Sequence, residues 1–425
     1  MGGQRRVAIA CQGGGSHTAF TAGVLSRWLR DGEPDGVRIV GFSGTSGGAA
    51  CATLAWRAFV AGDPADAPRR LRGYWADTAA DTPVELAANV GLVWTSVLQN
   101  VGLVPLISPY DVPLPAQETF RALVRPWVEL DGIEADTGGT YPMLLIGAVD
   151  VLSGRFRAFN SHNEAITVDS ILASAAIPTV FPAAHLPDGV YWDGLFSQNP
   201  PVRELLDSQP DELWVIQINA TAIPEEPRTI LDIADRRNEL AGNLSLFQEL
   251  RTIERVDRLL EDGALAAGGR YRHIVVRVLE LARSRSSQML GPSSKLNRDR
   301  RFLRELMAQG EEQAEEFLAA LRFEAAWRAR DEEALTRMVG DDLEVTSLPP
   351  FPERGALRGT GAREFVRDYL APKVQMDLCR AQRTAERAIW TVDVEYDGVS
   401  GRGQVEAEVD NGVVTRIRLG PAPQR

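Results

Sequence analysis

The stretch that decides the fold is Ile39-Val40-Gly41-Phe42-Ser43-Gly44-Thr45-Ser46-Gly47-Gly48-Ala49-Ala50. It begins with apolar, β-branched residues, passes through Gly-x-Ser-x-Gly and continues into an alanine-rich run, which predicts a strand, a tight turn and a helix. In a nucleophile elbow, small flanking residues let the backbone turn sharply and expose one hydroxyl at the end of the strand. Ser46 is therefore the candidate nucleophile.

A second glycine-rich turn lies upstream of this stretch. Val7–Ala10 has the pattern of a strand, Gly13-Gly14-Gly15 follows it, and a helix is predicted over Thr18–Arg30 before the strand at Val37–Val40. This βαβ order predicts a parallel sheet with both glycine turns at its carboxyl edge. Because backbone amides at a helix start bind anions, the three glycines are candidate donors to an oxyanion.

A dinucleotide-binding loop is the competing interpretation of these glycines. The Gly-x-Gly-x-x-Gly pattern needs a glycine where Thr18 stands, so it is not matched. The three cysteines, Cys11, Cys51 and Cys379, have no metal-ligand spacing and are interpreted as small buried apolar residues. We therefore expect neither a metal nor an organic cofactor.

A serine hydroxyl needs a base within hydrogen-bond reach. The order Ser46, Asp193, His273 would suit a hydrolase triad, but His273 lies at a predicted strand start rather than in a loop. Asp193 follows Val190-Tyr191-Trp192 at a predicted strand end, where aromatic surroundings of low dielectric can raise the pKa of a carboxyl group. Asp193 is therefore the predicted base, and a simple Asp-Gly turn is the alternative.

Length and charge limit the classes of protein that this chain can belong to. Its 425 residues exceed one ordinary core, so two or three domains are expected. A net charge of -12 argues against a general affinity for nucleic acid. No apolar stretch has the length of a signal peptide's core at the N-terminus or of a membrane span, so we expect a cytoplasmic protein.

Two segments have more than one interpretation. Val84–Leu106 is mostly apolar, which indicates a buried helix and loop, or else a mobile cover over an apolar acyl pocket or a surface that faces a membrane. Arg283–Arg301 mixes Ser, Gly and Pro with six basic residues, which indicates a solvated loop or a contact with an anionic head group.

The pattern of predicted helices and strands changes after a long charged helix predicted over Phe302–Leu321. A helix over Phe323–Val339 is followed by a Pro-rich loop and by three alternating strands between Ala388 and Leu419. This pattern predicts a separate α+β domain with a curved antiparallel sheet.

Four motifs in this order resemble those of patatin-like phospholipases. They are Gly13-Gly14-Gly15, Gly44-Thr45-Ser46-Gly47-Gly48, Ala173–Pro182 and Asp193-Gly194. The resemblance covers about Arg5 to Val202 and implies a three-layer α/β/α domain with a mainly parallel central sheet. It also implies a catalytic dyad of Ser46 and Asp193, with Gly13, Gly14 and Gly15 supplying oxyanion amides. Gln12, His17 and Thr18 depart from the family's usual Asp, basic residue and Gly, which leaves the dyad in place.

The last part of the chain, Phe323 to Leu419, resembles the cone-shaped nuclear transport factor 2-like fold. This resemblance implies a binding module or a dimerisation module, through which the chain would form a homodimer. The expected domains are thus residues 1–321, with a core at about 5–202 and an extension at about 203–321, and residues 322–425.

Together these resemblances imply a serine acyl hydrolase that cleaves lipid carboxyl esters through an acyl-enzyme. Its partners would be a lipid or another acyl ester and, peripherally, a membrane. Two alternatives remain open. One is a non-catalytic lipid-binding or scaffold protein with the same fold, and the other is a thioesterase or polyester depolymerase that uses the same dyad.

Overall fold

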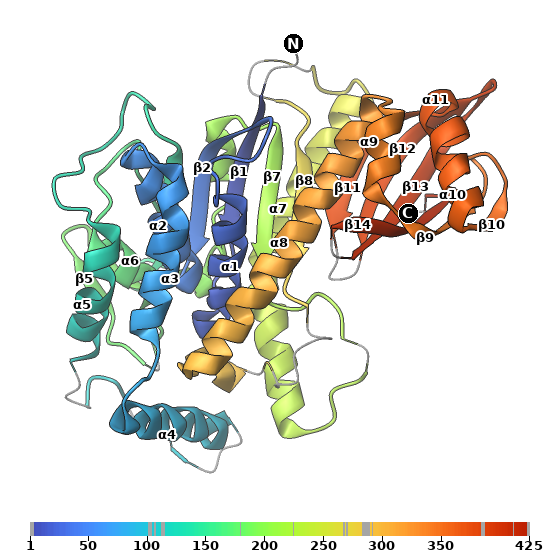
Figure 1. Ribbon diagram of the computed structural model, residues 1–425. Helices are drawn as coiled ribbons and strands as arrows, with labels where there is room; N and C mark the ends of the chain where they lie inside the picture. The colour runs from blue at the N-terminus through green and yellow to red at the C-terminus, as the bar shows by residue number, and fades with distance from the viewer. Residues whose placement is uncertain are drawn as a thin grey trace. The chain divides into compact units, whose positions relative to one another are not determined.

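The computed structural model (Figure 1) describes residues 4–100, 104–105, 108–111, 115–178, 180–223, 225–266, 268, 271–282, 290, 292–383, 387–410 and 412–422. The chain forms two compact units, which we call unit 1 (Met1–Ile274 with Arg283–Glu311) and unit 2 (Val275–Ala282 with Glu312–Arg425). The predicted boundary between residues 321 and 322 falls inside the helix α8 (Arg300–Arg328). A continuous helix carries no turn signal, so its sequence does not mark where one unit ends.

The sheet of unit 1 has the strand order β7-β1-β2-β3-β6-β5, and β4 pairs with β3. Its strands are β1 (Arg5–Cys11), β2 (Val37–Thr45), β3 (Met143–Asp150), β4 (Phe156–Asn160), β5 (Ala184–Leu186), β6 (Gly189–Asp193) and β7 (Glu212–Gln217). The four strands β7, β1, β2 and β3 are parallel, whereas β4 and β6 run antiparallel to β3. The mainly parallel sheet expected from the βαβ pattern is therefore confirmed.

Helices follow the strands of unit 1 as the alternation of patterns predicts. They are α1 (Ala19–Trp28), α2 (Gly47–Val60), α3 (Ala67–Thr78), α4 (Pro83–Asn100), α5 (Ala116–Val128), α6 (Val168–Ala175) and α7 (Ile230–Glu261). Short 3-10 turns are η1 (Gly15–Thr18), η2 (Pro64–Asp66), η3 (Gly194–Phe196), η4 (Glu204–Ser208) and η5 (Pro292–Leu296). Consecutive residues of β3 and β7 are buried, so both faces of the sheet are covered.

The helix α4 differs from the interpretation of Val84–Leu106 as a buried helix and loop. Val84 is 79% exposed and Trp94 is 61% exposed, so much of the apolar surface of α4 faces solvent. Residues 101–103 and 106 of this segment lie outside the described residues. The second ambiguous segment is Arg283–Arg301. Its residues 290 and 292–301 lead into η5, form η5 and begin α8. Residues 283–289 and 291 lie outside the described residues.

The strands of unit 2 have the order β10-β9-β14-β13-β12-β11-β8. Its elements are β8 (Val275–Glu280), α9 (Glu332–Met338), β9 (Val339–Ser347), β10 (Gly355–Arg358), α10 (Gly359–Phe365), η6 (Val366–Leu370), α11 (Ala371–Lys373), β11 (Gln375–Arg383), β12 (Ala388–Tyr396), β13 (Val399–Asp410) and β14 (Val413–Pro421). The strands β12, β13 and β14 pair antiparallel in chain order, as the alternating pattern predicts, and β11, which was not predicted, pairs antiparallel with β12.

A buried ion pair lies in the core of unit 2. Arg277 Nη1 is 2.7 Å from Glu324 Oε2, which also accepts a hydrogen bond from Trp390 Nε1 at 2.7 Å. These partners satisfy the two charges, which would otherwise be costly to bury. Among the helices that the structure describes, none combines the length and apolar character needed to cross a membrane.

Within unit 1, α1 and the first turns of α8 cross at two glycines. A methyl group at Gly310 would overlap the carbonyl oxygen of Phe20, and one at Gly23 would overlap the carbonyl oxygen of Met307. The two backbones therefore approach more closely than any larger residue would allow. This crossing fixes the first third of α8 against the helix that follows the glycine loop.

We predict that Gly310→Ala lowers the thermal midpoint of the protein, because the added methyl group must push two helix backbones apart. Overpacking of this kind costs about 1–3 kcal/mol. Gly91→Ala in α4 is the matched control, since a methyl group there meets no atom within 4 Å. Alanine has a better helix propensity than glycine by about 1 kcal/mol, so this variant should raise the midpoint. Thermal unfolding followed by circular dichroism checks both signs, and equal effects would contradict the proposed close crossing.

Candidate active site

Ser46 occupies the turn between β2 and α2, as the Gly-x-Ser-x-Gly pattern predicts. Its backbone has φ 56° and ψ -130°, a conformation that residues with a side chain rarely adopt and that is typical of a nucleophile elbow. The Ser46 amide donates to Ser174 Oγ at 2.9 Å, and that hydroxyl donates to the Gly147 carbonyl at 2.6 Å. The side chain of Ser174 therefore ties the strained turn to β3.

The register of three neighbouring strands brings Asp193 to the same place. Thr45 at the end of β2 pairs with Gly147, and Asp193 at the end of β6 pairs with the next residue, Ala148. Because β2 and β6 flank β3, Ser46 and Asp193 lie on either side of the same point of that strand. The structure thus brings together the two residues that the sequence predicts as nucleophile and base.

The carboxyl group of Asp193 is buried, with 1% of the residue exposed. Oδ1 accepts a hydrogen bond from the Leu195 amide at 2.8 Å, while Oδ2 has no hydrogen bond of full geometry among the described residues. Loss of hydration raises the pKa of Asp193 to about 7, against the lowering effects of the Leu195 amide, the adjacent Ser46 hydroxyl and the charge of Lys295. A carboxylate with this pKa suits proton transfer near neutral pH.

The glycine loop packs directly against the elbow. A Cβ at Gly13 would lie 3.1 Å from Ser46 Cβ and 2.6 Å from the Thr45 carbonyl oxygen. The Gly13 amide donates to Asn199 Oδ1 at 2.7 Å, so it is already occupied. The amides of Gly14 and Gly15 have no hydrogen-bond partner among the described residues. Gly13 stays a predicted oxyanion donor, and Gly14 and Gly15 are the two that are free to serve.

Gln12 holds the base of this loop with four hydrogen bonds. Its Oε1 accepts from the amides of Ile218 and Asn219, at 2.8 and 2.9 Å. Its Nε2 donates to the Gly242 carbonyl at 3.1 Å and to Asn243 Oδ1 at 2.9 Å. The side-chain amide therefore uses both donor and acceptor capacity, which a carboxylate at this position would not provide.

Lys295 braces the other side of the loop from η5. Its Nζ lies 2.8 Å from Asn219 Oδ1 and 2.8 Å from Asn238 Oδ1, which fixes the ammonium group. A Cβ at Gly15 would overlap the Lys295 carbonyl oxygen, so the two backbones are in close contact. The positive charge acts on the Asp193 carboxyl group and favours its ionised form.

Two of the histidines, His17 and His273, have partners other than Ser46 and Asp193. His273, considered above as the third member of a triad, lies 3.7 Å from Asp257 through Nδ1 and is half exposed. His17 Nε2 lies 2.7 Å from Ser294 Oγ, and its ring packs edge-on against Phe302. Within the described residues, no group of three or more His, Cys, Asp or Glu side chains is arranged to hold a metal ion.

Three contributors to the site were not predicted from the sequence. Ser174 lies inside the Ala173–Pro182 motif, and Asn199 follows Asp193 by one short turn. Both residues could therefore have been found from their closeness in the sequence to motif residues. Lys295 had no such signal, because it reaches the loop from a segment that is distant in the chain. These residues act on Ser46, Gly13 and Gly15 through hydrogen bonds and close packing.

A serine elbow at the carboxyl edge of a mainly parallel sheet is an architecture typical of hydrolases. Residues 9–206 match the family model described as patatin-like phospholipase. Unit 1 therefore contains a patatin-like phospholipase domain, of a family of lipid acyl hydrolases. No curated protein matches the chain in a sequence search.

Solved structures of nuclear transport factor 2-like proteins are similar to the C-terminal part of the chain. One from Cytophaga hutchinsonii is 12% identical and covers 25% of this chain and 89% of its own, with a TM-score of 0.22. One from Mesorhizobium loti is 18% identical, with 26% and 92% covered and a TM-score of 0.23. A putative ketosteroid isomerase from Kribbella flavida is 18% identical, with 26% and 81% covered and a TM-score of 0.22. Similarities at this level carry no argument about activity.

We predict that kcat/KM for an ester substrate rises with pH through a midpoint near 7, because Asp193 accepts a proton only when it is ionised. Lys295→Met should move this midpoint upward, since removal of a positive charge makes the carboxylate harder to form. Lys295→Arg retains the charge and should keep the midpoint near that of the wild type. A pH–rate profile whose midpoint is the same for Lys295→Met and wild type would contradict this electrostatic role.

Proposed function

We propose that the protein is a serine acyl hydrolase that cleaves lipid carboxyl esters with a dyad of Ser46 and Asp193. The observation that carries this proposal is the juxtaposition of the strained Ser46 with the buried carboxyl group of Asp193 across the end of β3. A glycine loop with free amides beside the same serine supplies the third component that acyl transfer needs.

In the proposed reaction, Ser46 Oγ attacks the ester carbonyl carbon while Asp193 takes the hydroxyl proton. The amides of Gly14 and Gly15 donate hydrogen bonds to the oxyanion, and Gly13 joins them if Asn199 releases its amide. Collapse of the tetrahedral intermediate expels the alcohol, which receives the proton from Asp193. Asp193 then deprotonates water, which attacks the acyl-enzyme. The second tetrahedral intermediate collapses with loss of the Ser46 oxygen, which takes the proton back from Asp193, and the carboxylic acid is released.

A carboxylate can serve as the base here because the protein raises its proton affinity. An exposed aspartate has a pKa near 3.8 and is a poor acceptor for a serine proton, whereas burial raises the pKa of Asp193 to about 7. Lys295 and the Leu195 amide limit that rise, so a useful fraction of the group is ionised at neutral pH. No imidazole is needed in this scheme.

The alternative functions that the sequence leaves open can be distinguished by experiment. A thioesterase or polyester depolymerase would use the same dyad, and a panel of oxygen esters, thioesters and polyesters distinguishes these substrates. A lipid-binding or scaffold protein would bind lipid without labelling by an active-site probe. The lipid ester is preferred because the domain belongs to a family of lipid acyl hydrolases.

We predict that Ser46→Ala abolishes labelling by a fluorophosphonate probe and lowers ester turnover by about 10⁴-fold or more, because the nucleophile is lost. Asp193→Asn should lower turnover to a similar degree, since an amide accepts no proton from the serine. Ser400→Ala, an exposed serine of unit 2, is the control and should label and turn over like the wild type. Wild-type turnover by the Ser46→Ala protein would show that the proposed dyad is wrong.

A further inference from the structure

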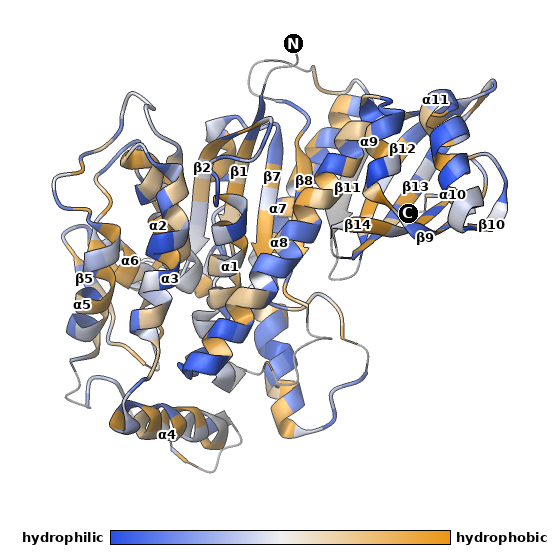
Figure 2. Cartoon of the chain, in the orientation of Figure 1, coloured by the Kyte–Doolittle hydropathy of each residue, from blue (hydrophilic) through white to orange (hydrophobic). Residues whose placement is uncertain are grey.

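The helix α4 exposes large apolar side chains to solvent, although the residue that it buries most fully among those described is polar. That residue is Asn89, which is 3% exposed. Val84, Leu86, Val90, Leu92 and Trp94 are all exposed to solvent. In Figure 2 most of α4 accordingly has the colours of hydrophobic residues. This is the reverse of the usual surface helix, whose apolar stripe faces the core.

Three of the exposed residues form a stripe along the helix. Leu86, Val90 and Trp94 recur every fourth residue, so their side chains follow one another along one side, and Val84 and Leu92 lie to either side of this stripe. Asn89 and Ser96, seven residues apart, share another side of the helix, about 100° around the axis from Val90. We call the set Val84, Leu86, Val90 and Trp94 the apolar face of α4.

This helix is attached to the same segment that braces the glycine loop. The Asn89 side chain donates to Asn297 Oδ1 at 2.8 Å and accepts from the Arg298 amide at 2.7 Å. Asn297 directly follows η5, whose Lys295 backbone contacts Gly15 of the loop. As Figure 1 shows, α4 therefore lies beyond the carboxyl edge of the sheet, at the end where Ser46 is found.

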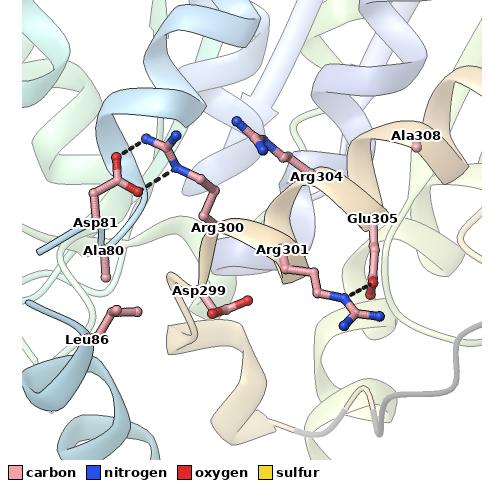
Figure 3. A pocket seen from close by; sticks show the side chains of 9 residues that line it. All are labelled: Ala80, Asp81, Leu86, Asp299, Arg300, Arg301, Arg304, Glu305 and Ala308. Carbon is pink, nitrogen blue, oxygen red and sulfur yellow. Dashed lines mark hydrogen bonds and ion pairs between the residues drawn. The ribbon is translucent and has the colours of Figure 1, made fainter. Parts of the chain in front are cut away.

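A pocket beside α4 adds a positive charge to this end of unit 1. It has a volume of about 530 Å³ and is lined by Ala80, Leu86 and the first turns of α8 (Figure 3). Arg300 pairs with Asp81, and Arg301 pairs with Glu305 at 2.7 Å. Of the charged residues that line the pocket, Arg304 alone makes neither an ion pair nor a hydrogen bond within the described structure.

We propose that the apolar face of α4 docks on the surface of a phospholipid layer and that Arg304 contacts a lipid phosphate in the adjoining pocket. The proposal rests on the proposed function in one respect: the docked layer would supply the ester substrate to Ser46. The apolar face inserts at the level of the head groups, as amphipathic helices with tryptophan do, and the guanidinium group meets the phosphate above it.

Three features favour a lipid layer over a protein partner or a second copy of the chain. Trp94 has the amphipathic ring that is enriched where one side of a surface is apolar and the other is wet. Arg304 and Leu86 line the same pocket, so an anionic group and an apolar group could be bound at one site, as both are present in a phospholipid. The surface also lies at the catalytic end of the sheet, where a lipid substrate must arrive.

The charge balance indicates which of the two contributions dominates. The chain carries a net charge of -12, and the pocket's other arginines are paired with Asp81 and Glu305. Binding should therefore depend mainly on the apolar face, with a smaller, salt-sensitive contribution from Arg304. The two contributions can be separated by testing vesicles with and without anionic lipid.

The first test measures vesicle binding in the Ser46→Ala background, so that the result does not depend on turnover. The full chain is mixed with vesicles of phosphatidylcholine, or of phosphatidylcholine with phosphatidylglycerol, and sedimented. Combined Val84→Gln, Val90→Gln and Trp94→Gln substitutions should weaken partitioning to both vesicle types by about tenfold or more. Leu348→Gln with Val399→Gln, two exposed apolar residues of unit 2, is the control and should bind like the parent.

The second test isolates the charge. Arg304→Gln should weaken binding to the anionic vesicles by about fivefold and leave binding to phosphatidylcholine nearly unchanged. Arg304→Lys should restore most of the loss. Because the Arg304 side chain is exposed and unpaired, its replacement should leave the fold intact. Circular dichroism checks the folding of each variant. If the triple variant does not fold, Arg304→Gln still tests the proposal.

Several outcomes would overturn the proposal. It is wrong if the parent protein does not sediment with either vesicle, or if the triple variant and Arg304→Gln both bind like the parent. It is also wrong if the triple substitution leaves vesicle binding unchanged and instead converts a dimer into a monomer, as measured by sedimentation equilibrium. In that case α4 would be a contact between two copies of the chain. Vesicle binding by a wild-type protein without esterase activity would leave the docking surface standing while the proposed function fails.

Discussion

The site depends on the close packing of two glycine turns. Gly13 lies so near Thr45 and Ser46 that a side chain at this position would overlap the elbow, and a Cβ at Gly47 would overlap the Thr18 hydroxyl. Each turn therefore occupies the space that a side chain on the other would need. This contact places the candidate oxyanion donors beside the strained turn that carries the candidate nucleophile.

Segments beyond the matched family region complete this arrangement. Gln12 is bound by residues that flank the end of β7 and by α7, and Lys295 braces Gly15 from η5. Most of these contacts come from the stretch expected only as an extension of the patatin-like core. In structural terms, that extension belongs to the same domain as the glycine loop, since its residues hold that loop in place.

The sequence predicts the elbow, the glycine loop and Asp193 because each depends on residues that are close together in the chain. The pairing of β2 and β6 on either side of β3 follows from register, which a local pattern does not contain. The same limit applies to Lys295 and to the exposure of α4, whose apolar composition is equally typical of a core helix. The continuous helix α8 conceals the division between the units for a related reason, because no turn residue interrupts it.

The four hydrogen bonds of Gln12 have an evolutionary consequence. The patatin-like loop usually carries Asp at this position, and in this chain an Asp would remove the donor of Asn243 Oδ1, whereas the Gly242 carbonyl would keep the hydrogen bond from Asn199. Each buried group left unsatisfied costs about 1–3 kcal/mol. A change from Gln12 to Asp is therefore unfavourable unless Asn243 of α7 changes with it. Residue 12 and residue 243 should accordingly vary together among related chains.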